Sequence, residues 1–149
     1  MSNNSMSNNS MSKAKVLIVE DDDDLRRGLT RRLQHSGYAV VTAQDGVTAI
    51  SVARRERPDV VLLDLGLPAG SGLIVLERYA NLADLAAIPV VVLTGRDPRT
   101  AEPATRKFHV AAFLHKPADN KDLVNAIERA LRGETTLPDP PPPADASTP

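Results

Sequence analysis

Residues 16–24, VLIVEDDDD, join a fully apolar run directly to a series of five acidic side chains. An apolar run without polar alternation is typical of a strand that is covered on both faces of a parallel sheet. Acidic residues at the end of such a strand can form a solvated face, the start of a helix or a site for a cation. The rest of the sequence helps to decide between these three possibilities.

Four more segments have the character of strands. They are YAVVTA at residues 38–43, DVVLLD at 59–64, IPVVVLTG at 88–95 and AAFLHKP at 111–117. Between the strands, apolar residues recur at the spacing of a helix that covers a core. The four apolar stripes are Leu25, Leu29 and Leu33; Val47, Ile50 and Ala53; Leu73, Leu76 and either Tyr79 or Ala80; and Leu123, Ile127, Ala130 and Leu131.

The expected helix ends carry suitable residues. Asp22, Asp45 and Asp119 stand where a side chain would cap the first turn. Gly37 and Gly133 stand where two helices should stop. Asp22 therefore belongs to a helix start, and so do the two aspartates that follow it, because negative charge suits the first turn of a helix.

Strands that alternate with helices predict an α/β fold with a doubly wound, five-stranded parallel sheet and helices on both faces. In such folds ligands bind beyond the carboxyl ends of the strands. The residues that close the strands are therefore the candidates for a functional site. They are Glu20 and Asp21, Asp64, Thr94, and Lys116 after the last strand.

These side chains suit phosphoryl transfer. Carboxylates that lie together raise each other's pKa, and Mg²⁺, which takes oxygen ligands, removes the repulsion. Asp64 would then stay ionised as a nucleophile. Lys116 and the hydroxyl group of Thr94 are suitable donors to phosphoryl oxygens. The set predicts a site that forms an aspartyl phosphate with the help of a metal.

Composition and motif spacing exclude several other classes. The chain has 149 residues, a formal net charge of −1 and no cysteine, so a basic nucleic-acid surface, disulfides and thiolate metal sites are not expected. A calcium-binding EF-hand loop starting at Asp21 would place Leu25, Arg26 and Arg32 at positions that need oxygen ligands or glycine. Gly66 stands where a dehalogenase-like phosphatase would have a second aspartate, and an acidic loop does not suit a flavin phosphate.

Four segments together resemble the receiver domains of bacterial two-component response regulators. They are VLIVEDD at residues 16–22, VVLLDLGLPAGSG at 60–72, VVVLTG at 90–95 and FLHKP at 113–117. Their order and spacing also agree with that family, and the resemblance covers nearly all of residues 15–132. It implies a flavodoxin-like strand order of 2-1-3-4-5.

The resemblance also implies roles for the acidic residues. Asp64 would accept a phosphoryl group from a phosphohistidine on a sensor histidine kinase or a histidine phosphotransfer protein. Glu20 and Asp21 would hold Mg²⁺ together with Asp64 and the backbone carbonyl of Gly66. The chain would then catalyse only its own phosphorylation and dephosphorylation and would not be a conventional enzyme.

Further implied roles concern the switch. Thr94 and Lys116 would bind the phosphoryl oxygens, and the Lys116–Pro117 peptide bond would be cis. Phe113 would turn inward when Thr94 moves toward the phosphoryl group. The signalling face would consist of the fourth helix, the fifth strand and the last helix, and an unknown target protein would bind there. Pro103 inside the fourth helix and His109 in the following turn depart from the family pattern, and we expect irregular structure there.

The ends of the chain differ from its middle. Residues 1–12 repeat a polar unit and predict a disordered leader, while residues 135–149 hold half of the twelve prolines and predict an extended, disordered tail. Residues 13–134 would form one receiver domain, a single-domain response regulator in the cytoplasm that contacts neither nucleic acid nor membrane directly. The alternative is a docking module of the same fold that works without phosphorylation.

Overall fold

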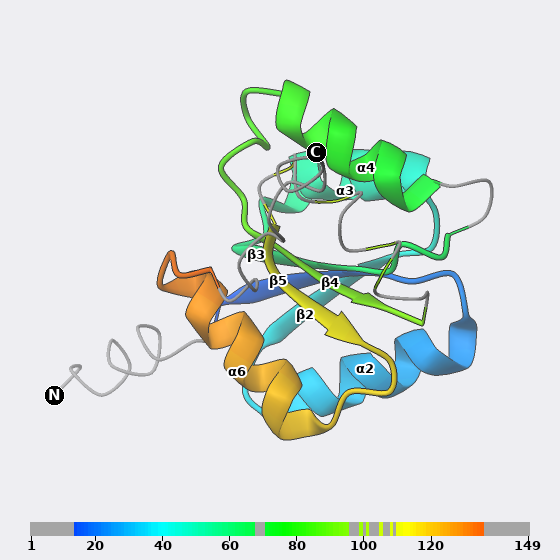
Figure 1. Ribbon diagram of the computed structural model, residues 1–149, viewed down its shortest axis with the longest axis vertical. Coiled ribbons are helices and arrows are strands. Elements are labelled where there is room, and N and C mark those ends of the chain that lie inside the picture. Colours follow the sequence, from blue (N-terminus) through cyan, green and yellow to red (C-terminus); the bar gives the residue numbers. More distant parts are fainter. Residues whose placement is uncertain are drawn as a thin grey trace, which may run out of the picture.

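The computed structural model describes residues 14–67, 71–95 and 110–135, together with Arg99, Ala101, Thr105 and Phe108. Within these residues, a parallel sheet lies between two layers of helices (Figure 1). The expected leader and most of the expected tail lie outside the described residues, and so do Pro103 and His109. The predictions for these residues therefore remain predictions.

The sheet contains five parallel strands in the order β2-β1-β3-β4-β5, which confirms the predicted fold class and strand order. The strands β1, β3 and β4 are buried almost throughout, because each has a strand on both sides and helices on both faces. The edge strand β2 is partly exposed. The strands span Lys15–Val19 (β1), Ala39–Ala43 (β2), Val60–Leu63 (β3), Val90–Thr94 (β4) and Val110–His115 (β5).

Four described helices cover the sheet. The helices α3 and α4 pack on one face, and α2 and α6 pack on the other (Figure 1). No helix within the described part of the chain is long and apolar enough to cross a membrane. The helices span Asp23–His35 (α2), Gly46–Glu56 (α3), Ser71–Asn81 (α4) and Asn120–Leu131 (α6).

The predicted helix ends are confirmed. The side chains of Asp22, Asp45 and Asp119 each accept a hydrogen bond from the backbone N–H three residues later, at 2.9, 2.8 and 2.8 Å. Gly37 and Gly133 follow α2 and α6 with φ values of 97° and 80°, which favour glycine. These contacts fix where α2, α3 and α6 begin and where two of them stop.

The predicted apolar stripe of α3 is wrong at Val47, whose relative exposure is 83%. The buried residues of this helix are Ala49, Val52 and Ala53. Val47 precedes Ala49 by two residues, and this separation turns a side chain by about 200° around an α-helix. Val47 therefore faces outward, and small residues bring α3 close to the sheet.

Two contacts fix the position of α4. A Cβ atom at Gly72 would lie 2.5 Å from the Cα atom of Leu65, so only glycine allows this close approach of α4 to the loop after β3. The hydroxyl group of the buried Tyr79 donates a hydrogen bond of 2.9 Å to the carbonyl oxygen of Ala49. Tyr79, not Ala80, therefore continues the apolar stripe of α4 and also ties this helix to α3.

We predict that Gly72→Ala lowers the free energy of unfolding by about 1–3 kcal/mol, because the added methyl group meets backbone atoms that have little room to move. Gly28 provides a matched control, because a Cβ atom there meets nothing within 4 Å in the middle of α2. Gly28→Ala should raise the same free energy by roughly 0.5–1 kcal/mol. Urea denaturation of both variants measures the difference, and equal effects would contradict the close approach.

A second prediction concerns alkaline pH. Burial raises the pKa of the Tyr79 hydroxyl above its ordinary value of 10.0. The unfolded chain therefore releases this proton first, so the stabilising contribution is complete below pH 10 and shrinks above it. Tyr79→Phe should lower the free energy of unfolding by about 1 kcal/mol at pH 7 through the lost hydrogen bond. The same variant should show a less steep fall in the free energy of unfolding between pH 9 and 11. Parallel curves for wild type and variant would show that Tyr79 does not cause this fall.

Candidate functional site

The central strands end in acidic residues whose backbone positions are fixed by hydrogen bonds. The N–H of Glu20, directly after β1, donates to the carbonyl oxygen of Ala43 at 3.0 Å. The N–H of Asp64, directly after β3, donates to the carbonyl oxygen of Val19 at 3.1 Å. Because both bonds continue the pairing of neighbouring parallel strands, the two side chains leave the sheet at the same edge.

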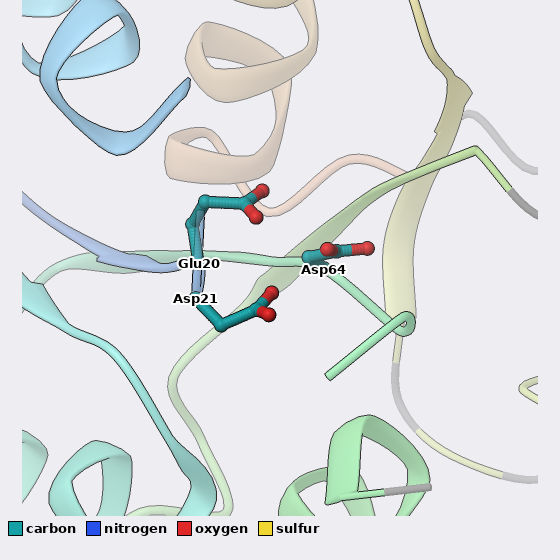
Figure 2. A group of neighbouring side chains, drawn as sticks. All are labelled: Glu20, Asp21 and Asp64. Atoms are coloured by element: carbon teal, nitrogen blue, oxygen red, sulfur yellow. The ribbon is translucent and has the colours of Figure 1, made fainter. Parts of the chain in front are cut away.

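Three carboxylates meet at this edge. Oxygen atoms of Glu20, Asp21 and Asp64 lie within 4.8 Å of one another, and Figure 2 shows the three side chains grouped around a common space. Glu20 and Asp64 are only 2% and 7% exposed, whereas Asp21 is exposed. The predicted convergence of these carboxylates is confirmed. Buried carboxylates need close partners, because burial without compensation is costly.

Those partners are present for both buried carboxylates. The ammonium group of Lys116 donates to Glu20 Oε1 at 2.9 Å and to Asp64 Oδ2 at 3.3 Å. The backbone N–H of Asp22 donates to Glu20 Oε2 at 3.1 Å, and that of Gly66 donates to Asp64 Oδ1 at 2.8 Å. Each of the four oxygen atoms therefore has a donor, and the side chains of Glu20 and Asp64 are held in defined orientations.

The site remains negative in spite of Lys116. Three carboxylates and one ammonium group leave a net charge of −2 when all are ionised. Burial raises the pKa of Glu20 above its ordinary value, and the negative charge of Asp64 adds to this effect. The hydrogen bonds from Lys116 and from the backbone of Asp22 act in the opposite sense but do not cancel it. Burial alone would lower the pKa of Lys116, but the hydrogen bond to Glu20 and the neighbouring negative charges outweigh it and raise that pKa. Both directions indicate a site that favours additional positive charge.

The other predicted residues lie at the ends of β4 and β5, next to the three carboxylates or further along these strands. Thr94 ends β4 and is fully buried, and its carbonyl oxygen accepts a 2.8 Å hydrogen bond from the backbone N–H of Lys116. The Lys116–Pro117 bond is cis, as the resemblance implied. Phe113 is partly buried and instead packs against the apolar cluster under α3 and α4. The backbone of Thr94 thus contacts that of Lys116, and five predicted residues lie together at this edge: Glu20, Asp21, Asp64, Gly66 and Lys116.

Arg26 is a neighbour of the site that the sequence analysis missed. Its guanidinium group donates to the carbonyl oxygen of Glu20 at 2.9 Å and forms an ion pair with Asp23. The side chain is 17% exposed and lies on α2. It therefore supports the backbone of the acidic segment. The sequence could have predicted the ion pair, because Asp23 and Arg26 are three residues apart on a helix. It carries no signal for the contact of Arg26 with the carbonyl oxygen of Glu20.

Gly66 lies close to the carboxylate of Asp64. A Cβ atom at this position would lie 3.3 Å from Asp64 Oδ1 and 3.5 Å from Oδ2. A side chain at position 66 would therefore crowd both carboxylate oxygens of Asp64, on the side away from Lys116.

Known proteins are similar to this chain in sequence and in fold. The family model for the response regulator receiver domain matches residues 16–128. Protein PilH of Pseudomonas aeruginosa is 32% identical over 120 residues, which cover 80% of this chain and 99% of PilH. Response regulator MprA of Mycobacterium sp. (strain KMS) is 35% identical over 90% of this chain, but the match spans only 56% of MprA.

A solved structure supports the fold. The receiver domain of the sensor histidine kinase PA1611 from Pseudomonas aeruginosa has a TM-score of 0.74 and 23% sequence identity. The match covers 80% of this chain and 98% of that domain, which has a magnesium ion coordinated in its active site cleft. The fold, the matched segment and the similarity to PilH lead to one conclusion: this chain belongs to the response regulator receiver domain family of two-component systems.

Proposed function

We propose that Asp64 accepts a phosphoryl group from a phosphohistidine on a partner protein and that the modified chain binds a target protein differently. The partner would be a sensor histidine kinase or a histidine phosphotransfer protein. The observation that carries this proposal is the position of Lys116, whose ammonium group contacts both Glu20 and Asp64 beside the exposed Asp21. A buried carboxylate with a lysine and further acids beside it suits an acceptor of phosphoryl groups.

The residues fit a magnesium ion. Three carboxylates within reach of one another carry more negative charge than Lys116 can balance. Mg²⁺ prefers oxygen ligands and is usually bound by a small number of carboxylates. Glu20, Asp21 and Asp64 would hold the ion, together with the backbone carbonyl of Gly66. When bound, the ion would supply positive charge that offsets the charge of the incoming phosphoryl group.

The proposed step uses an oxygen atom of Asp64 as the nucleophile. A bond forms between this oxygen and phosphorus, the bond between phosphorus and the histidine nitrogen breaks, and the leaving imidazole takes a proton from solvent. Lys116 would hold one phosphoryl oxygen, and the Thr94 hydroxyl group would hold another. Hydrolysis of the aspartyl phosphate would later release phosphate.

The proposed response begins at Thr94. Its hydroxyl group would move toward the phosphoryl group, and Phe113 would turn inward into the space released beside it. Thr94 and Phe113 lie on the neighbouring strands β4 and β5, and His115 on β5 is the register partner of Thr94. A phosphoryl group adds nearly two negative charges and so biases the equilibrium between two states. The proposed signalling face contains β5 and α6, and also the fourth helix that the sequence predicts.

Our prediction for the metal uses melting temperature. Mg²⁺ should raise the melting temperature in proportion to the logarithm of its concentration once the site is nearly full. Without Mg²⁺, Asp64→Asn should raise the free energy of unfolding by about 1 kcal/mol, because one charge leaves a crowded acidic site. This variant should also respond less to Mg²⁺. Asp24→Asn, at an exposed position in α2, is the control and should retain the response of wild type. A melting temperature that ignores Mg²⁺ would contradict the metal site.

Phosphorylation itself is tested with a small phosphoryl donor such as phosphoramidate. Wild type should become labelled only with Mg²⁺ present, Asp64→Asn should not be labelled, and Asp21→Asn should lose most of the labelling. Asp24→Asn should be labelled like wild type, because its charge belongs to the start of α2. Labelling of Asp64→Asn equal to that of wild type would refute the assignment of the acceptor. Absence of Mg²⁺-dependent labelling in all four proteins would favour the docking module that works without phosphorylation.

A further inference from the structure

A groove lies between α3 and α4, on the face of the sheet opposite to α2 and α6. It has a volume of about 860 Å³, and apolar side chains from both helices line it. Two of them, Val47 and Ile74, are 83% and 46% exposed and are the exposed large apolar residues of the described chain. Ile50 and Val75 continue the apolar lining. Exposed apolar residues that gather in one groove indicate a surface for binding.

The same groove has a positive end. Its lining includes Arg54 and Arg55 in the last turn of α3 and Arg78 in the last turn of α4. Arg54 pairs with Asp84 at 3.3 Å and Arg55 with Glu56 at 3.2 Å, whereas Arg78 forms no ion pair within the described part of the chain. The acidic residue in the lining is Asp45, at the opposite end of α3, where it caps the helix.

This positive end lies at the edge of the sheet where the strands begin. Helix α3 ends at Glu56 and leads into β3, and α4 ends at Asn81 and leads toward β4. The last described residue, Thr135, leaves the domain at the same edge, because it lines a hollow there together with Asp59 at the entry to β3. The chain after Thr135 therefore starts at the same edge of the sheet as the arginine residues of the groove.

The sequence after Thr135 has the chemistry that the groove requires. Residues 136–149, TLPDPPPPADASTP, contain two aspartates, one leucine and six prolines, and no lysine or arginine. Proline has no backbone N–H, so covering it against an apolar groove leaves no donor without a partner. A polyproline helix is also extended before it binds, so docking costs little conformational entropy. Fourteen residues in this form span about 43 Å. The α3 helix has eleven residues and is about 17 Å long, so the extended tail is more than twice as long as this side of the groove.

We propose that residues 136–149 fold back onto the groove between α3 and α4 of the same chain. Asp139 pairs with the arginine residues at the positive end. The prolines at 140–143 cover Ile50, Ile74 and Val47. A second copy of the chain fits less well, because it would bring its own Arg54, Arg55 and Arg78 to this surface. This contact does not depend on phosphorylation of Asp64.

The absence of cysteine allows a direct test in the full-length chain. A nitroxide spin label at Ala146→Cys should broaden the amide NMR signals of α3 and α4 and leave those of α2 unchanged. Val47→Asp should weaken this broadening, and so should Arg54→Glu combined with Arg78→Glu. These positions are exposed, so the domain should remain folded. Arg27→Glu combined with Arg31→Glu, at exposed positions of α2, is the matched control and should leave the broadening unchanged.

Charge exchange gives an independent readout. Asp139→Lys should weaken the broadening in the wild-type domain and restore it in the variant with Arg54→Glu and Arg78→Glu. Two results in the single chain would overturn the proposal: no selective broadening of α3 and α4, or broadening that survives the arginine changes. A third is broadening between chains, seen when a chain with nitroxide but no isotope label is mixed with an isotope-labelled chain that has no nitroxide. The last result would indicate a second copy as the occupant. No phosphoryl donor is present, so failure here leaves the function of Asp64 unaffected.

Discussion

The ion pairs of Lys116 with Glu20 and Asp64 are the interaction on which the acidic end of the sheet depends. The parallel strands β1 and β3 bring two buried carboxylates to one edge, and burying them without donors would be costly. Lys116 supplies two of the required contacts, and the backbone N–H groups of Asp22 and Gly66 supply the other two. The acidic pair thus combines a defined geometry with a remaining excess of negative charge.

Much of the fold and the site could be predicted from residue order alone. The strands β1, β3 and β4 are apolar at nearly every position, and Glu20 and Asp64 follow two of these strands directly, so topology places the carboxylates together. The aspartate caps could also be predicted, because capping depends on residues three positions apart. These features depend on local sequence or on a rule that every parallel sheet follows.

Features that depend on contacts between distant elements could not be predicted in the same way. Val47 has a place in a helical repeat, but the true contact face of α3 is set by Ala49 and Ala53, whose small side chains carry a weak pattern. The hydrogen bond of Tyr79 to Ala49 joins two helices whose separation the sequence does not reveal. The contact of Arg26 with the carbonyl oxygen of Glu20 is equally invisible, because any backbone oxygen can accept it.

Lys116 also joins strands that are not neighbours. It follows β5, whereas Glu20 and Asp64 follow β1 and β3, and β4 lies between them and β5. Within the described sheet, β5 is an outer strand that pairs with β4 alone, so its carboxyl end is attached both by backbone bonds and by this charged tether. Backbone bonds are nearly constant, but the strength of the tether varies with every charge that enters or leaves the acidic site. The local order of the outer strand is therefore an adjustable property of this protein, set by electrostatics at a distance of two strands.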